Sequence, residues 1–363
     1  MSDRSYNFSA GPATLPEPVI KTAQLALWNL DRSGVGVMEH SHRGPQLTAV
    51  YQQAEQNIRA LAKVPDNYRI LFLQGGASSQ FYMIPMNLLG ADQTADYINT
   101  GTWSKKAMTE ARKFGNVHEV ASSAGDNFTF VPPADALKWS KGKPAYAHFT
   151  SNNTIAGTQF HFEPKPPDGV PLINDASSDI FSRPINVKNH GIIYAGAQKN
   201  LGPAGLTLVI IRDDLADRGA ETLPTMLQYR THVSKGSMFN TPPTFAMFVL
   251  GEVIKWIQGF GGLAAMNEYN VAKANVLYEF LDDSSFFSAT AAKGSRSLMN
   301  VCFRAAKPEL EESFINLAGQ QGLVGLKGHR SVGGMRASIY NAFPHEGVLK
   351  LVEFMKEFET THR

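Results

Sequence analysis

Six short apolar runs, separated by helical or long connecting segments, constrain the fold of this chain most strongly. Short runs of this kind are typical of strands, and strands joined by long connections form mostly parallel sheets covered on both faces. The six runs are residues 70–73, 95–99, 145–150, 172–174, 192–195 and 206–211. Ligands bind such sheets at the carboxyl ends of the strands, so we expect the site in the loops that follow these runs.

Helical periodicity accompanies the strands. One apolar stripe recurs with the spacing of a helix face and comprises Leu47, Val50, Tyr51, Ala54, Ile58 and Leu61. After residues 241–243 the chain becomes helix-rich, and its last hundred residues contain strand candidates at 298–303 and 336–340 before a final amphipathic helix. We therefore expect an α/β protein with a large domain followed by a smaller α+β domain.

Composition excludes several classes of protein. The 363 residues have a formal net charge of only +2 and scattered basic residues, so we expect no nucleic-acid or membrane partner. Cys302 is the single cysteine, which excludes an internal disulfide and a cysteine zinc cluster. No apolar run approaches membrane-spanning length and no secretory h-region occurs near Met1, so we expect a cytoplasmic protein.

Lys199 lies in a connection rich in Gly and Pro between two strand candidates. An ammonium group beside apolar strands loses solvation, which lowers its pKa, and a neutral lysine amine can attack a carbonyl to form an imine. The alternative is a surface lysine that lies along its own aliphatic stem, which is far commoner for a lysine chosen at random.

Residues 75–80, Gly-Gly-Ala-Ser-Ser-Gln, connect the strand candidate 70–73 to an apolar helical stretch. Glycine backbone amides, serine hydroxyls and a helix N-terminus together could hold a phosphate group. An ordinary helix-capping turn is the alternative. Neither a Walker A sequence nor Gly-x-Gly-x-x-Gly occurs here, which argues against P-loop and dinucleotide chemistry.

Three more residues follow strand candidates and could surround a planar heteroaromatic ring. Asp175 could keep a ring nitrogen protonated, because an opposite charge raises the pKa of that nitrogen. Trp103 could stack on the ring, and Thr154 offers a hydroxyl group. The alternatives are a helix N-cap for Asp175, core packing for Trp103 and a plain turn for Thr154.

Basic side chains form two local groups. The first contains His40, His42 and Arg43, and the second contains His329, Arg330 and Arg336. Guanidinium groups pair bidentately with carboxylate or phosphate, so these groups suit a substrate with two anionic groups. A metal site on the two histidines of the first group is disfavoured, because no third ligand follows at a recognisable spacing. Two solvated basic turns are the remaining alternative.

The motifs along this chain resemble those of the phosphoserine aminotransferases, which are fold-type-I enzymes dependent on pyridoxal 5′-phosphate (PLP). The match runs almost from end to end, through motifs at residues 7–12, 39–44, 74–81, 177–180, 194–200, 202–206, 240–243, 328–330 and 333–341. The resemblance implies a seven-stranded, mostly parallel sheet between helices in a large domain of residues 16–262. Residues 1–15 and 263–363 would form the small domain.

The resemblance also implies a role for each cofactor-side residue. Lys199 would form an imine with PLP, Asp175 would bind the pyridinium nitrogen, and Trp103 would stack on the ring. Thr154 would contact the phenolic oxygen. The phosphate would be held by Ala77, Ser78 and Gln198, together with Asn240 and Thr241 from the neighbouring subunit of a homodimer. Some members carry glycine and arginine in place of Ala77 and Ser78, so a hydroxyl here replaces an ionic contact.

On the substrate side, Arg336 would bind the α-carboxylate. The substrate phosphate, or the distal carboxylate of glutamate, would be held by His42, Arg43, His329 and Arg330, with Ser9 in the same pocket. The implied reaction is reversible transamination between glutamate and 3-phosphohydroxypyruvate, giving 2-oxoglutarate and O-phosphoserine for serine biosynthesis. The phosphorylated hydroxythreonine precursor of vitamin B6 is a further candidate substrate. The alternatives are another fold-type-I PLP enzyme with a small non-phosphorylated substrate, and a non-catalytic anion-binding protein.

Overall fold

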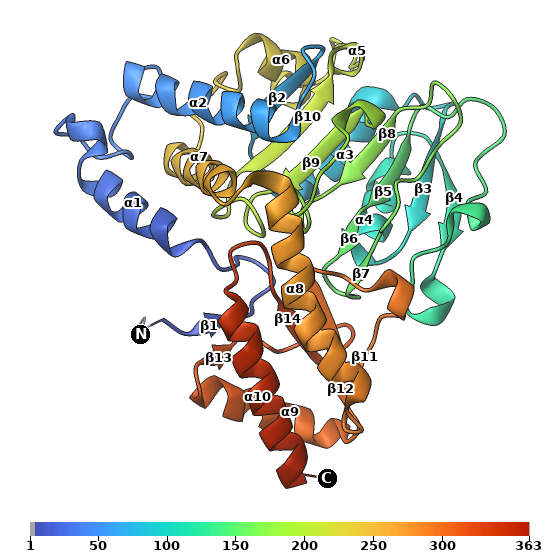
Figure 1. Cartoon of the computed structure of the whole chain (residues 1–363). Coiled ribbons are helices and arrows are strands. Elements are labelled where there is room, and N and C mark those ends of the chain that lie inside the picture. Colours follow the sequence, from blue (N-terminus) through green and yellow to red (C-terminus); the bar gives the residue numbers. More distant parts are fainter. Residues whose placement is uncertain (1–3, 363) are drawn as a thin grey trace.

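Figure 1 shows a computed structural model of the chain, in which residues 4–362 are described. A large sheet with helices on both faces occupies the upper part of the view, and a smaller group of helices and strands lies below it. Helix α8 (Gly262–Asp283) extends from the first part into the second. The arrangement agrees with the α/β class expected from the sequence.

The large sheet has seven strands within the described residues, in the order β2-β10-β9-β8-β5-β3-β4. The strands are β2 (Tyr68–Leu73), β3 (Thr94–Asn99), β4 (Asn116–Ser122), β5 (Ala147–Thr150), β8 (Leu172–Asp175), β9 (Ile192–Gly196) and β10 (Thr207–Arg212). β10 is antiparallel to both neighbours and the other pairs are parallel, which confirms a mostly parallel sheet. All six predicted runs are strands of this sheet. The sequence reading missed β4, an edge strand whose side chains are mostly exposed or half-buried.

Alternate residues of the central strands face two different layers of helices. On β10, Leu208 and Ile210 belong to the core formed with α1 (Glu17–Trp28), α2 (Pro45–Ala62) and α7 (Thr244–Gly259). Val209 and Ile211 belong to the core on the other face, formed with α3 (Gly76–Leu88) and α4 (Thr102–Ala111). Burial of each such side chain contributes about 1.5–3 kcal/mol, so a strand that is apolar at every position is stable only between two layers.

The smaller part has its own core. An antiparallel sheet is formed by β11 (Phe287–Ala289), β12 (Asn300–Ala305) and β14 (Met335–Ser338), and β1 (Tyr6–Asn7) pairs in parallel with β13 (Leu323–Val324). Helices α8, α9 (Glu311–Gln320) and α10 (His345–His362) pack on it. Phe8 is fully buried in this core. The N-terminal arm therefore packs with the C-terminal residues. The division into 16–262 and 1–15 with 263–363 stays a prediction.

The remaining short strands and α-helices are β6 (Asn152–Asn153), β7 (Thr158–Gln159), α5 (Asp213–Ala216) and α6 (Tyr229–Ser234). None of the helices in the described part of the chain is long and apolar enough to cross a bilayer.

The register of the large sheet places the residues that build the site. Thr150, at the end of β5, pairs with Asp175, at the end of β8, and Asp175 pairs with Tyr194 on β9. Paired residues of adjacent parallel strands face the same side of a sheet. The loop that leaves β9 carries Lys199, so the carboxyl edge brings an acid and a lysine toward each other.

Candidate active site

Lys199 is half-buried in the turn between β9 and β10. Its Nζ donates a hydrogen bond to Thr154 Oγ1 at 2.5 Å and lies 5.2 Å from the centre of the Trp103 ring. The pKa of Lys199 is lowered to about 8, chiefly by burial; the charge of Asp175 opposes this shift and that of Arg336 adds to it. An appreciable fraction of this amine is therefore neutral near pH 7, as a lysine nucleophile or base requires.

Asp175 is buried at the end of β8, with 3% of its surface exposed. Burial raises the pKa of its carboxyl group, and hydrogen bonds from Ser177 together with the charge of Lys199 oppose this rise. The Ser177 hydroxyl and backbone N–H both donate to Asp175 Oδ1, at 2.6 and 3.1 Å. The Gly196 N–H in turn donates to Ser177 Oγ at 3.1 Å. Strand β9 therefore holds Ser177 in position, and Ser177 orients the Asp175 carboxylate.

Ser177 is a functional residue that sequence reasoning missed. It lies in the motif 177–180, but nothing in that motif alone indicates which side chain a serine contacts. Gly11 is a second such residue, because a Cβ atom at this position would lie 3.2 Å from Lys199 Cγ. The N-terminal arm therefore approaches the lysine at Gly11.

The turn before α3 borders the same cavity as Lys199. Gly75 and Gly76 have φ angles of 89° and 67°, in the region that favours glycine, and a Cβ on Gly75 would lie 1.9 Å from Ser79 Oγ. The Ser79 hydroxyl donates to the Gly75 carbonyl at 3.1 Å, whereas the Ser78 hydroxyl bonds to no described residue. The first backbone N–H groups of α3 have no partner within the helix, so Ala77 and Ser78 offer donors to an anion.

A cavity of about 270 Å³ lies between these groups. Its lining includes the predicted residues Ala77, Ser78, Trp103, Asp175, Gln198 and Lys199. Sequence reasoning did not select Thr150, Asn152 or Ser178, which also line it. Thr150 was already recognised as the end of a strand, but its direction into the cavity depends on the register with Asp175.

The residues present fit PLP. The cavity contains a lysine amine for an aldehyde, a buried carboxylate for a ring nitrogen and an indole ring for stacking. Thr150 Oγ1 and Trp103 Nε1 are buried beside it and have no hydrogen-bond partner among the described residues. Because buried polar atoms normally have partners, these two atoms indicate a polar ligand in the cavity.

Arg336 connects the small domain to this centre. It lies on β14, and its Nη1 donates to the backbone oxygen of Thr154 at 3.2 Å. A second cavity, of about 350 Å³, is lined by Arg336, His329 and Arg304. Burial lowers the pKa of His329, and the nearby charges of Arg336 and Arg330 add to the effect. Two members of this basic group, His329 and Arg336, therefore line one cavity, and Arg336 also contacts Thr154, the hydrogen-bond partner of Lys199.

Several predicted residues line neither of these two cavities: Ser9, His42, Arg43, Thr154, Arg330, Asn240 and Thr241. Arg43 is exposed on the loop before α2, and the buried His42 Nε2 has no hydrogen-bond partner among the described residues. The Thr241 backbone oxygen accepts from Gln74 Nε2 at 3.5 Å, which places the 240–243 motif near the turn at Gly75. The described residues of one chain thus form the cofactor side more completely than the substrate side.

Comparison with known proteins places the chain in a family. Residues 5–351 match the family model of the class-V aminotransferases. The phosphoserine aminotransferase of Desulfotalea psychrophila is 54% identical over 99% of this chain and 98% of the relative. That of Geobacillus kaustophilus is 53% identical over 98% of each.

Solved structures agree with this placement. The phosphoserine aminotransferase from Bacillus circulans subsp. alkalophilus superposes with a TM-score of 0.97 at 47% identity, over 100% of both chains. The PLP-bound phosphoserine aminotransferase from Trichomonas vaginalis superposes with a TM-score of 0.92 at 41% identity, over 97% of this chain and 100% of that one. This chain therefore belongs to the class-V aminotransferase family and, within it, to the phosphoserine aminotransferases.

Proposed function

We propose that this protein transfers an amino group reversibly between glutamate and 3-phosphohydroxypyruvate, giving 2-oxoglutarate and O-phosphoserine. The observation that carries the proposal is the cavity in which Lys199, with its pKa lowered to about 8, meets Asp175 and Trp103. The full-length similarity to phosphoserine aminotransferases supports the choice of substrates. The reaction belongs to serine biosynthesis.

The cofactor for this reaction is PLP, which supplies an electron sink for the electrons released at the substrate Cα. Asp175 binds the ring nitrogen and keeps its proton in place, because a carboxylate raises the pKa of a neighbouring cationic nitrogen. Ser177 holds the Asp175 carboxylate in a fixed orientation through its bonds to Oδ1. Trp103 covers the ring and excludes water from that face.

Lys199 holds and moves the proton. As a neutral amine it would remove the proton from the substrate Cα, and as an ammonium group it would deliver the proton to the cofactor carbon. Its low pKa makes both forms accessible near neutral pH. Thr154, which accepts the Lys199 hydrogen bond at 2.5 Å, orients the amine. The same hydroxyl would contact the phenolic oxygen of the bound cofactor.

The basic residues select the substrate. Arg336 binds the α-carboxylate, since it already reaches the backbone of Thr154. His329 and Arg330 bind the distal phosphate of phosphoserine or the distal carboxylate of glutamate, and Ser9 contributes to the same pocket. Guanidinium groups suit both anions because their paired N–H donors match carboxylate and phosphate oxygens.

A second copy of the chain completes the site. His42 and Arg43 line neither cavity of their own chain, so in this proposal they act on the substrate bound by the neighbouring copy. Asn240 and Thr241 likewise reach the cofactor phosphate of the neighbour, alongside Ala77, Ser78 and Gln198. Figure 1 shows α1 and the loop after it projecting from the body of the chain.

The projecting segment has the surface of an interface. Leu25, Trp28 and Met38 are 74%, 86% and 62% exposed. Large apolar side chains grouped on one projecting segment are typical of protein–protein contacts. We propose a homodimer in which this segment packs against the second copy, and a cytoplasmic location for it.

A half-reaction tests the proposed function. Phosphoserine added to the purified holoenzyme should convert its absorption spectrum to that of the aminated cofactor, and glutamate should do the same. Serine should react far more slowly, because it lacks the phosphate that the basic residues bind. A response to serine as strong as that to phosphoserine would indicate a non-phosphorylated substrate, and no response to any amino acid would indicate a protein without transaminase activity. Phosphohydroxythreonine in the same assay measures the second candidate substrate.

A further inference from the structure

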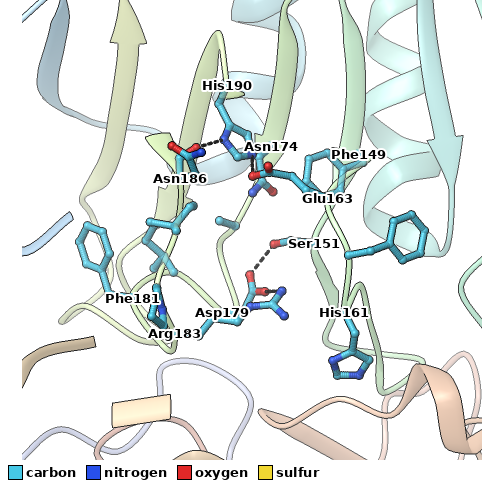
Figure 2. A pocket seen from close by; sticks show the side chains of 15 residues that line it. Phe149, Ser151, His161, Glu163, Asn174, Asp179, Phe181, Arg183, Asn186 and His190 are labelled. Atoms are coloured by element: carbon cyan, nitrogen blue, oxygen red, sulfur yellow. Dashed lines mark hydrogen bonds and ion pairs between the residues drawn. The ribbon is translucent and has the colours of Figure 1, made fainter. Parts of the chain in front are cut away.

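A third cavity, with several polar side chains, lies on the face of the large sheet opposite to the cofactor cavity. Consecutive residues of a strand point to opposite faces, so β8 directs Asp175 to the cofactor cavity and Asn174 to the other side. A cavity of about 280 Å³ surrounds Asn174, and its lining shares no residue with that of the cofactor cavity. Figure 2 shows its polar side chains, with Glu163 and Asn174 close to His190.

His190 presents a hydrogen-bond acceptor to this cavity. The side chain is 1% exposed, and its Nδ1 lies 3.1 Å from the backbone oxygen of Asn186. A carbonyl oxygen only accepts hydrogen bonds, so Nδ1 carries the proton. Burial lowers the pKa of His190, although Glu163 opposes the shift, and the neutral ring leaves Nε2 without a proton. Nε2 has no hydrogen-bond partner among the described residues.

Two more acceptors lie beside Nε2. Glu163 Oε1 is 3.4 Å from it, and the second carboxylate oxygen of Glu163 is already bonded by the Asn189 amide. Asn174 is 4% exposed, and its buried Oδ1 has no partner in the described part of the chain. Two acceptors, His190 Nε2 and Asn174 Oδ1, are thus buried without a donor, and the half-buried Glu163 carboxylate adds a negative charge beside them. Because buried polar atoms normally have hydrogen-bond partners, this arrangement favours a donor from outside the chain.

We propose that this cavity binds the protonated primary amino group of a small molecule. An ammonium group offers three N–H donors, no acceptor and a positive charge, which matches Glu163, His190 and Asn174 in number and in sign. Phe149 and Ile185 provide an apolar wall for the carbon chain of the ligand. Glu163 is half-buried, so the ligand enters on its side. The site is independent of the transamination.

The ligand is either a simple amine or an amino acid, because Arg183 lies at the other end of the cavity. Arg183 Nη2 is 3.3 Å from Asp179 Oδ2, so its charge is already largely balanced. Butylammonium and alanine are suitable probes for the two cases, and n-butanol is the uncharged control. Both amines could react with the cofactor, so the titrations use holoenzyme reduced with borohydride, in which Lys199 and PLP are permanently joined.

Isothermal titration calorimetry measures binding to this protein and to three variants. Butylammonium should bind the parent, and Glu163→Gln and Asn174→Leu should each weaken binding about tenfold or more, since a hydrogen bond to a charged group is lost. The matched control is Glu346→Gln, the same change in another cavity, which should leave binding unchanged. n-Butanol should not bind measurably.

The outcomes separate the ligands and test the site. If alanine binds more tightly than butylammonium and Arg183→Gln removes the difference, the ligand is an amino acid. If the two affinities are equal, the ligand is a simple amine. Both results support the proposal. Absence of binding by both amines overturns it, as does binding that Glu163→Gln and Asn174→Leu leave unchanged. Far-ultraviolet circular dichroism and the cofactor spectrum establish that each variant is folded before its titration is interpreted.

Discussion

The cofactor side and the substrate side of the candidate site are assembled in different ways. On the cofactor side, Trp103, Asp175 and Lys199 come from the ends of neighbouring strands or the loops after them, and they line one cavity. On the substrate side, Arg336 reaches Thr154 from the small domain, whereas Arg43 is exposed and lines neither of the two cavities.

The difference follows from the origin of each group. Parallel strands end at one edge of the sheet, so residues distant in sequence meet there without any further arrangement of the chain. The basic groups instead lie on a loop and in a second domain, whose meeting depends on domain position and, in our proposal, on a second copy. We therefore expect substitutions on the cofactor side to act within one chain and those of Arg43 to act between chains.

The largest effect is expected for Lys199→Ala. Removal of the proton-transferring amine should lower turnover of phosphoserine and 2-oxoglutarate at least about a thousandfold. The borohydride-reducible visible absorption of the bound cofactor should also disappear. Lys105→Ala, an exposed lysine on α4, is the matched control and should retain turnover. Full turnover by Lys199→Ala would contradict the assignment.

A graded pair of substitutions tests the support of the cofactor ring. Asp175→Asn removes the charge that keeps the ring nitrogen protonated and should lower kcat about a hundredfold. Ser177→Ala removes one hydroxyl bond to the Asp175 carboxylate and should lower kcat only about tenfold. Steady-state kinetics measure both. A larger loss in Ser177→Ala than in Asp175→Asn would show that the serine does not act through the carboxylate.

The difference between the cofactor side and the substrate side also explains which residues of the site could be predicted from the sequence. Asp175, Trp103 and Lys199 were identifiable because each follows an apolar run, and the sheet places such residues together whatever the details of packing. The edge strand β4 was not identifiable from the sequence, because an exposed strand has no continuous apolar pattern.

Contacts that depend on tertiary packing were also beyond the sequence. Ser177 acts through a bond across to Gly196 on β9, and Gly11 approaches Lys199 from the N-terminal arm. The cavity around Asn174 exists because a loop covers the second face of the sheet, and no motif marks it. The roles that the family resemblance implies for Asn240 and Thr241 stay predictions, because a single chain does not contain the neighbouring subunit.

Mixed dimers test whether Arg43 acts between chains. Arg43→Ala alone should raise the KM for phosphoserine about tenfold or more, since a charge-assisted contact to the phosphate is lost. This variant is mixed with Lys199→Ala and the two are allowed to exchange subunits. If Arg43 binds the substrate of the neighbouring chain, each heterodimer contains one site in which both Arg43 and Lys199 are intact. At phosphoserine concentrations well below the KM of the parent, random exchange should then restore about a quarter of the parent activity.

The control for this experiment is the pair Arg336→Ala and Lys199→Ala. Arg336 contacts Thr154 of its own chain, so a heterodimer of these variants contains no complete site and should recover no activity. Recovery equal to that of the Arg43 mixture would show that the gain has another cause. Absence of recovery in the Arg43 mixture would place Arg43 in the site of its own chain.

The smallest expected effect is a shift in the pH at which Lys199 becomes reactive. In the cofactor-free protein the rate of PLP capture should rise with pH through about 8, because only the neutral amine attacks the aldehyde and burial sets its pKa there. Arg336→Gln removes a positive charge that lowers the pKa of Lys199, so the midpoint should move to higher pH. Asp175→Asn removes a negative charge that raises the pKa of Lys199, so the midpoint should move to lower pH.

The control is Arg304→Gln. Arg304 lines the second cavity but is not among the charges that act on Lys199, so this variant should leave the midpoint in place. Shifts of the same sign in Arg336→Gln and Asp175→Asn would show that packing around the lysine, and not these two charges, controls its pKa.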